Sequence, residues 1–211
     1  MSRDNILHKV RTALGRSAGQ AVAGPPPVRL RVPEVAMEDR IAQMRARVEA
    51  LAGKTARVPA MEAAREFVAA EIAGRTALAS NAPYLVECGI ASLPGVRTGI
   101  TEIGELTEVC AQVDIGITSA DYVLSDTGTL VMLASPAEAR LVSLLPPAHI
   151  AVIPRERILT GLDELFTLLP DPAAQTSSMV MITGPSQTAD IEQVLIRGVH
   201  GPGQITVIIV G

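Results

Sequence analysis

The chain reads Asp121-Tyr-Val-Leu-Ser-Asp-Thr-Gly-Thr-Leu-Val-Met-Leu133 near its middle, and this stretch decides the fold. Two apolar runs, 122–124 and 129–133, predict two strands, and the short connection between them predicts a hairpin. The connection holds a polar cluster, Asp126, Thr127, Gly128 and Thr129. Buried carboxylates and hydroxyls are destabilising unless they find hydrogen-bond partners. The cluster therefore indicates either a ligand-binding site or a tightly specified structural turn.

The composition favours an α/β domain. Of 211 residues 48% are hydrophobic and only 2% aromatic, so the core must be built from Ala, Val, Ile and Leu. Such a core is typical of a buried, mostly parallel sheet that is covered by helices. A formal net charge of −4, few aromatic residues and no long basic run argue against a nucleic-acid partner.

The lengths of the apolar runs, the number of cysteines and the spacing of the histidines constrain the cellular location and the cofactors of the protein. The longest apolar runs are strand-sized, short of the roughly 20 residues of a membrane span, and no signal-peptide apolar region follows Met1. We therefore expect a soluble, cytoplasmic protein without a membrane span. The two cysteines, Cys88 and Cys110, cannot alone supply a four-cysteine cluster. Metal-binding histidine spacings are missing, so we expect no metal site.

Residues 1–33 are predicted to form a separate N-terminal segment. Apolar residues recur at helical spacing between Ser2 and Leu14, with Ser2 as the predicted N-cap. A Pro/Gly-rich linker follows as far as Pro33. The sequence leaves open whether this helix folds back, packs on a partner or is disordered. The main domain is predicted to span residues 34–211.

Within the main domain, helical patterns alternate with short apolar runs. Helices are predicted over 37–51, 59–72, 161–169 and 186–196. Strands are predicted at 76–79, 114–117, 122–124, 129–133, 150–153, 179–182 and 205–210. This alternation predicts a largely parallel α/β sheet with one hairpin.

The segment from Ile182 to Glu192 is the first candidate ligand site outside the hairpin. A strand is predicted to end at a Gly184-Pro turn, and Ser186 stands where a helix N-cap belongs. The N-terminus of a helix offers free N–H groups to an anion. Ligand-binding candidates are therefore Gly184, Ser186, Thr188, Asp190 and Glu192. The alternative is that these residues only cap and stabilise the predicted helix.

Three further side chains are candidates for chemistry. His200 is displayed by a turn that contains Gly201, and it is the best general acid or base because histidine titrates near neutral pH. Arg140 is predicted either to clamp an anionic substrate, to pair with Asp126 or Glu138, or to be an ordinary surface residue. For His200 a structural loop role is the alternative, and for His149 a structural role is favoured.

Asp126-Thr-Gly is also the signature of aspartic proteases. Those enzymes need two such aspartates that share a proton, and this chain has one copy. They are also all-β, whereas several helical patterns occur here. The protease hypothesis is therefore rejected, and Asp126 remains a catalytic or binding candidate.

Five motifs together resemble the LUD domain of the LutC/YkgG proteins. They are Ile115-Gly-Ile-Thr-Ser-Ala-Asp-Tyr122, Asp126-Thr-Gly-Thr-Leu-Val131, Ser143-Leu-Leu-Pro-Pro-Ala-His-Ile150, Thr183-Gly-Pro-Ser-Gln-Thr-Ala-Asp-Ile-Glu192 and Gly198-Val-His-Gly-Pro202. The resemblance is specific over about 110–210 and looser over about 35–109. Members commonly carry Glu where this chain has Asp126, so a role that needs the longer side chain is in doubt.

The resemblance implies a three-layer α/β/α domain similar to the NagB/RpiA/CoA-transferase superfamily. It also implies membership of a bacterial system that oxidises L-lactate to pyruvate, whose other components are cysteine-rich iron–sulfur proteins. The chain has neither those cysteines nor a flavin or nicotinamide motif, so we expect no cofactor and a non-redox, accessory role. The alternative is a stand-alone enzyme or sensor that binds a small anionic metabolite, such as an organic acid, a sugar phosphate or a CoA ester.

Overall fold

The structure is a computed structural model that describes residues 2–20, 32–189 and 195–211. It divides into two units, Met1–Leu30 and Arg31–Gly211. The first contains α1 (Arg3–Ala13), and the side chain of Ser2 accepts a hydrogen bond from the Asn5 N–H at 3.4 Å, so the predicted N-cap is confirmed. In the described parts of the chain, no helix combines the length and apolar character that crossing a membrane requires.

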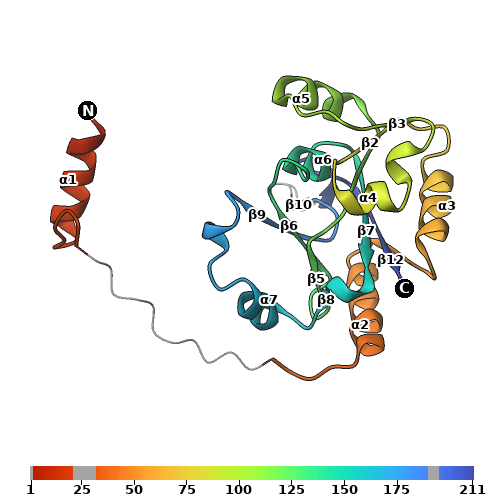
Figure 1. Cartoon of the computed structure of the whole chain (residues 1–211), viewed down its shortest axis with the longest axis horizontal. Helices are drawn as coiled ribbons and strands as arrows, with labels where there is room; N and C mark the ends of the chain where they lie inside the picture. The colour runs from red at the N-terminus through yellow and green to blue at the C-terminus, as the bar shows by residue number, and fades with distance from the viewer. Residues whose placement is uncertain (1, 21–31, 190–194) are drawn as a thin grey trace. The chain divides into compact units, whose positions relative to one another are not determined.

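The second unit is built on a six-stranded sheet (Figure 1). Its strands are β1 (Lys54–Val58), β2 (Ala77–Ala79), β3 (Val96–Arg97), β4 (Ile115–Thr118), β7 (Ala148–Pro154) and β12 (Gln204–Val210). They lie in the order β1-β12-β7-β4-β2-β3, and every neighbouring pair is parallel. The predicted parallel α/β sheet is therefore confirmed.

Helices cover both faces of this sheet. They are α2 (Met37–Ala50), α3 (Met61–Glu71), α4 (Pro83–Glu87), α5 (Ile103–Gln112) and α6 (Arg140–Leu144). A further helix, α7 (Leu162–Leu168), packs instead against Leu124 and Val131, outside this sheet. On one face, Val68 of α3 and Leu85 of α4 share a core with the sheet. On the other face, α2 packs through Met44, and α5 and α6 share a core with Leu78 of β2.

A second, mixed sheet packs on the α2 side of the large one. It contains β8 (Ile158–Leu159), β5 (Tyr122–Leu124), β6 (Thr129–Leu133) and β9 (Met179–Thr183), in that order. The β5–β6 pairing is antiparallel, so the predicted hairpin is confirmed. Val123 and Leu130 of this sheet share a core with Val207 and Ile209 of β12. The hairpin thus belongs to a separate sheet, which the sequence did not reveal.

The predicted helix over 186–196 is wrong. Gln187–Ala189 (β10) and Leu195–Arg197 (β11) pair as an antiparallel two-stranded sheet, with residues 190–194 outside the described residues. The backbone before and after them is held by two hydrogen bonds, Ser186 N to Pro202 O at 2.8 Å and Gly198 N to Ser186 O at 3.0 Å. A short apolar pattern does not separate a strand from a helix by periodicity alone, which explains the error.

Several elements of the large domain were not predicted, namely β1, α4, β3, α5, α6 and β8, and for β1 and α5 the reason is visible in the structure. Strand β1 reads Lys-Thr-Ala-Arg-Val and lies at the edge of the sheet, so its polar residues stay partly exposed and hide the pattern. Helix α5 buries only one side, through Leu106, Val109 and Cys110, and its other positions are largely exposed.

Helix α6 lies directly against the central strand β4. A Cβ atom at Gly116 would stand only 1.8 Å from the carbonyl oxygen of Val142, so no other residue fits there without displacing α6. This contact fixes the segment that leads into α6, including Glu138. This segment lies beside the point where the strand order of the sheet reverses. From there the chain continues from β2 to β3 on one side and from β4 to β7 on the other. Open α/β sheets commonly bind ligands at such a reversal, beyond the carboxyl ends of the strands.

Replacing Gly116 by Ala is expected to lower the free energy of unfolding by about 1–3 kcal/mol or more, because the helix backbone must move. Gly104→Ala is the matched control. A Cβ there meets no atom within 4 Å and the residue lies in α5, so a gain of about 0.5–1 kcal/mol is expected. Urea unfolding of both variants measures the difference. Equal stability of the two would contradict the close contact.

Candidate functional site

The turn at Asp126-Thr-Gly-Thr129 is held mainly by structural contacts. Gly128 has φ +70° and donates its N–H to Leu124 O at 2.9 Å, so it closes the hairpin in a conformation that favours glycine. A Cβ atom at Gly128 would lie 3.0 Å from the backbone nitrogen of Val48 on α2. The predicted ligand-binding role of Gly128 therefore has a structural explanation, in the close approach of the turn to α2.

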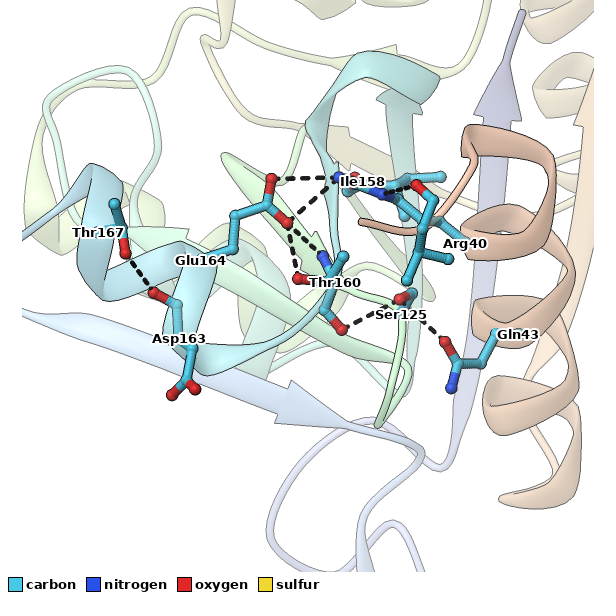
Figure 2. Close-up of polar contacts among 9 residues, drawn as sticks. Arg40, Gln43, Ser125, Ile158, Thr160, Asp163, Glu164 and Thr167 are labelled. Carbon is cyan, nitrogen blue, oxygen red and sulfur yellow. Dashed lines mark hydrogen bonds and ion pairs between the residues drawn. The ribbon is translucent and has the colours of Figure 1, made fainter. Parts of the chain in front are cut away.

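Hydrogen bonds fasten this hairpin to α2 and α7. The Ser125 hydroxyl is bonded to Thr160 O at 3.1 Å and to Gln43 Oε1 at 3.2 Å. Glu164 accepts from the N–H and the hydroxyl of Thr160, at 2.6 and 2.8 Å, and pairs with Arg40 at 3.2 Å. Figure 2 shows Glu164 pointing toward Thr160 and Arg40, with Ser125 between Thr160 and Gln43. Burial opposes ionisation of Glu164, but these hydrogen bonds and the Arg40 charge outweigh it and lower its pKa.

Asp126 is exposed at a cavity of about 440 Å³ that Gln43, Gly161 and Asp163 also line. The described lining residues include two carboxylates and no cation, an electrostatic setting that disfavours an anionic ligand. Gly161 leaves room for the Asp126 carboxylate, because a Cβ there would stand 2.6 Å from its Oδ2. Asp126 therefore lines a different cavity from Ser186 and His200.

A chain of hydroxyl groups runs from Asp126 into the second sheet. Thr127 donates to Asp126 Oδ1 at 3.2 Å, and Thr129 donates to Thr127 at 2.8 Å. The Thr129 hydroxyl also lies 2.8 Å from that of Thr183 on β9. The two predicted threonines thus satisfy one another, which favours the structural-turn interpretation for them.

Four of the other predicted residues meet at a second cavity, of about 410 Å³. Gly184, Ser186, His200 and Gly201 all line it, together with Leu51, Leu144 and Met181. The Ser186 N–H is already bonded to Pro202 O, and no helix begins there, so the predicted anion site at a helix N-terminus is wrong. His200 is exposed. These residues were predicted from two separate motifs, and the backbone of the first is a strand pair where a helix was predicted.

The remaining predicted residues lie elsewhere. Arg140 is the first residue of α6 and donates to Ser178 Oγ at 3.3 Å. It forms no ion pair with Asp126, with Glu138 or with any other residue in the described part of the chain. Thr188 lies on β10, whereas Asp190 and Glu192 lie outside the described residues. Residues 2–20, 32–189 and 195–211 contain no group of three His, Cys, Asp or Glu residues that would hold a metal ion.

A third cavity, of about 180 Å³, lies at the carboxyl ends of β2 and β4 and gathers ionisable residues. Ser119 and Asp121 follow β4, Arg157 follows β7, and Glu138 comes from the segment before α6. These residues were missed as a site because they are far apart in sequence. The only available signal was the strand ends themselves, where ligands commonly bind.

Glu138 is the most perturbed group in this cavity. It is buried, and its Oε2 accepts from Ser80 Oγ at 3.0 Å and from the Ser119 N–H at 3.4 Å. Burial raises its pKa to about 8, reinforced by the charge of Asp121 and opposed by the hydrogen bonds and Arg157. Its Oε1 is buried without a hydrogen-bond partner among the described residues. At neutral pH Glu138 is therefore mostly a neutral acid with one unpaired oxygen.

His149 is completely enclosed on β7, where its Nε2 lies 2.7 Å from Thr118 Oγ1. Burial lowers its pKa to about 4, so the ring is neutral at pH 7. Its Nδ1 has no hydrogen-bond partner in the described part of the chain. The favoured structural role of His149 agrees with this position inside the sheet.

Comparison with protein families gives a match along most of the chain. The profile of the LUD domain matches residues 41–210. A crystal structure of a DUF162 family protein from Deinococcus radiodurans is similar in fold, with a TM-score of 0.63 and 18% identity, and the match covers 84% of this chain and all of that one.

The most similar curated relatives that we compared share one name, Lactate utilization protein C. That of Halalkalibacterium halodurans is 36% identical over 165 residues, covering 74% of this chain and 72% of the relative. Those of Exiguobacterium sp. and Bacillus subtilis are 40% and 37% identical, over 49% and 47% of this chain. These two matches cover only 46% and 43% of the length of those relatives.

Replacing His149 by Gln is expected to change how stability depends on pH. The lowered folded-state pKa of His149 favours the neutral ring, so this ring contributes a loss of stability as the pH falls from about 6.5 toward 4, whereas the raised pKa of Glu138 acts in the opposite direction. Between pH 7.5 and 5 the contribution of His149 amounts to about 2 kcal/mol, and His149→Gln should lack it, so the variant is expected to gain that much on the wild type as the pH falls. Urea unfolding at both pH values measures the change. His8→Gln, on the exposed helix α1, should keep the wild-type dependence, and an identical profile for His149→Gln would contradict the assignment.

Proposed function

The chain belongs to the LUD domain family, and from that premise we propose that it acts in lactate utilisation as a non-redox component. It would work beside iron–sulfur proteins that carry electrons when L-lactate is oxidised to pyruvate. The observation that carries the proposal is the shared name of the relatives, Lactate utilization protein C. Residues 1–33 would serve as a tethered helix and linker, and residues 34–211 as the LUD domain.

The cysteines support the non-redox part of the proposal. The chain has two, and iron–sulfur clusters are usually held by four thiolates. Cys88 and Cys110 are both buried free thiols in separate apolar cores, and burial raises the pKa of each. They are therefore poor metal ligands. Free thiols without a disulfide are also usual in a reducing compartment, which supports our placing the system in the cytoplasm.

The arrangement of the large sheet supports a further assignment. We place the domain with the three-layer α/β/α folds of the NagB/RpiA/CoA-transferase type. Helices α3 and α4 on one face and α2, α5 and α6 on the other fit that architecture. The second sheet would then be an addition to it.

A second candidate function is a stand-alone enzyme or sensor for a small anionic metabolite. The observation that favours it is the cavity at the ends of β2 and β4, where a cation and a buried acid meet. In this alternative the lactate relatives share the domain but the present chain acts alone.

Reconstitution with the two iron–sulfur partners tests the main proposal. Lactate oxidation is expected with all three proteins and to fall at least tenfold when this chain is omitted. The measurement is lactate-dependent reduction of an electron acceptor. Unchanged oxidation without the chain would defeat the proposal, and Gly104→Ala serves as a folded positive control.

A thermal-shift screen tests the alternative on the isolated chain. A ligand at 100 times its dissociation constant stabilises by about 2.7 kcal/mol, or roughly 5–10 °C for a chain of this size. The panel contains organic acids, sugar phosphates and CoA esters. A shift with one class supports a metabolite function, whereas no shift with any member counts against it.

A further inference from the structure

The cavity at the ends of β2 and β4 is lined by a cation, Arg157, and a buried acid, Glu138, and each has atoms without a hydrogen-bond partner among the described residues. Its polar lining is Tyr84, Glu87, Ser119, Asp121, Glu138 and Arg157. Ser119 joins the two central groups, because its N–H donates to Glu138 Oε2 and its hydroxyl accepts from Arg157 Nη1 at 2.9 Å. A ligand in the cavity would therefore meet the acid and the cation together.

Arg157 presents one edge of its guanidinium group without an acceptor. Its Nη1 is committed to Ser119 Oγ and to Ala120 O, at 2.9 and 2.8 Å. Its Nε and Nη2 have no acceptor, and the group forms no ion pair within 4 Å, among the described residues. The guanidinium lies 5.5 Å from the centre of the Tyr84 ring, which helps to fix its plane. A fixed Nε/Nη2 edge matches a carboxylate through two parallel hydrogen bonds.

Glu138 supplies the second contact. The residue has an exposed fraction of only 6%, and its Oε1 has no hydrogen-bond partner among the residues that the structure describes, although Glu138 lines the cavity. A buried polar atom without a partner is destabilising, so a ligand oxygen next to Oε1 would restore a hydrogen bond. Because the group is neutral at pH 7, it can donate to a hydroxyl or carbonyl oxygen.

The other carboxylates limit the charge of the ligand. Asp121 Oδ2 accepts from the Leu133 N–H at 2.7 Å, and both Asp121 and Glu87 line the cavity. A second negative charge on the ligand would be repelled by them. The volume of about 180 Å³ is also below the roughly 300–1,000 Å³ of pockets for larger ligands.

We propose that this cavity binds a small monocarboxylate with an oxygen on carbon 2, its carboxylate held by Arg157 and its second oxygen bonded to Glu138. This assignment of a 2-hydroxy or 2-oxo acid goes beyond the proposed function, because it names a site and a ligand class. It rests on the cavity and not on partner proteins. Binding can therefore fail while reconstitution succeeds, and the reverse.

Isothermal titration calorimetry of the full chain tests the ligand class. The probes are L-lactate, pyruvate, propionate, which lacks the second oxygen, and malate, which adds a carboxylate. Lactate or pyruvate is expected to bind about 10- to 100-fold more tightly than propionate, the usual range for one hydrogen bond that involves a charged or buried group. Malate is expected to bind at least about tenfold more weakly than lactate. Equal affinity for all four, or no binding of lactate and pyruvate at millimolar concentration, would overturn the proposal.

The pH dependence tests the residues and needs no variant for its first arm. Wild-type affinity is expected to fall as the pH rises from 7 to 9.5, because Glu138 loses its proton around pH 8 and then repels the ligand. Tyr84 is not expected to contribute, since burial raises its pKa above this range. Constant wild-type affinity over this range would overturn the role of Glu138.

Variants provide the second arm. Glu138→Gln should bind with constant affinity between pH 7 and 9.5, and Arg157→Lys should bind about tenfold more weakly or worse, because it loses the bidentate edge. Glu105→Gln and Arg97→Lys are matched controls. These two residues form an exposed ion pair with 3.9 Å between Arg97 Nη2 and Glu105 Oε1, and neither of them lines the cavity. Circular dichroism checks that each variant is folded. If Arg157→Lys binds like Arg97→Lys, the assignment of the carboxylate contact is wrong.

Discussion

The carbonyl oxygen of Val142 occupies the space that a side chain would need at residue 116, so α6 can lie on β4 only because that residue is glycine. The segment before α6 is anchored by this contact and is carried over the ends of β2 and β4. Glu138 in that segment then meets Ser80 and Ser119, which belong to two different strand ends. The buried acid thus depends on a close backbone contact that involves none of the ionisable residues themselves.

The three cavities divide the chemistry among different parts of the domain. Among the described residues, those that line the cavity beside Asp126 include carboxylates and no cation, and the cavity beside His200 combines an exposed imidazole with apolar side chains. Only the cavity at the strand ends combines a cation with a buried neutral acid, among the cavities described above. This cavity also lies where the strand order of the sheet reverses, which is where open α/β sheets commonly bind ligands. The topology therefore favours the same cavity as the ligand site.

Much of the fold was predictable from sequence, and the main candidate site was not. The runs at 122–124 and 129–133 gave the hairpin because alternation and turn residues are local signals, and Ser2 gave the cap of α1 for the same reason. The hairpin of β10 and β11 was mistaken for a helix, since short apolar patterns fit both. Glu138 was noted only as a partner for Arg140. Its burial and its protonation are created by strand ends that meet only in the folded chain.

The edge strand β1 has a consequence for the order in which the large sheet assembles. Its residues pair with β12, in the register Lys54 to Thr206 through Val58 to Val210, and β12 in turn pairs with β7. Synthesis delivers β1 well before the strand that joins it to the rest of the sheet. Until residues 204–210 leave the ribosome, β7 also lacks that neighbour, and the unpaired backbone edges of both strands are open to pairing with other chains. Closure of the core is therefore a late, long-range event, typical of slowly folding parallel sheets.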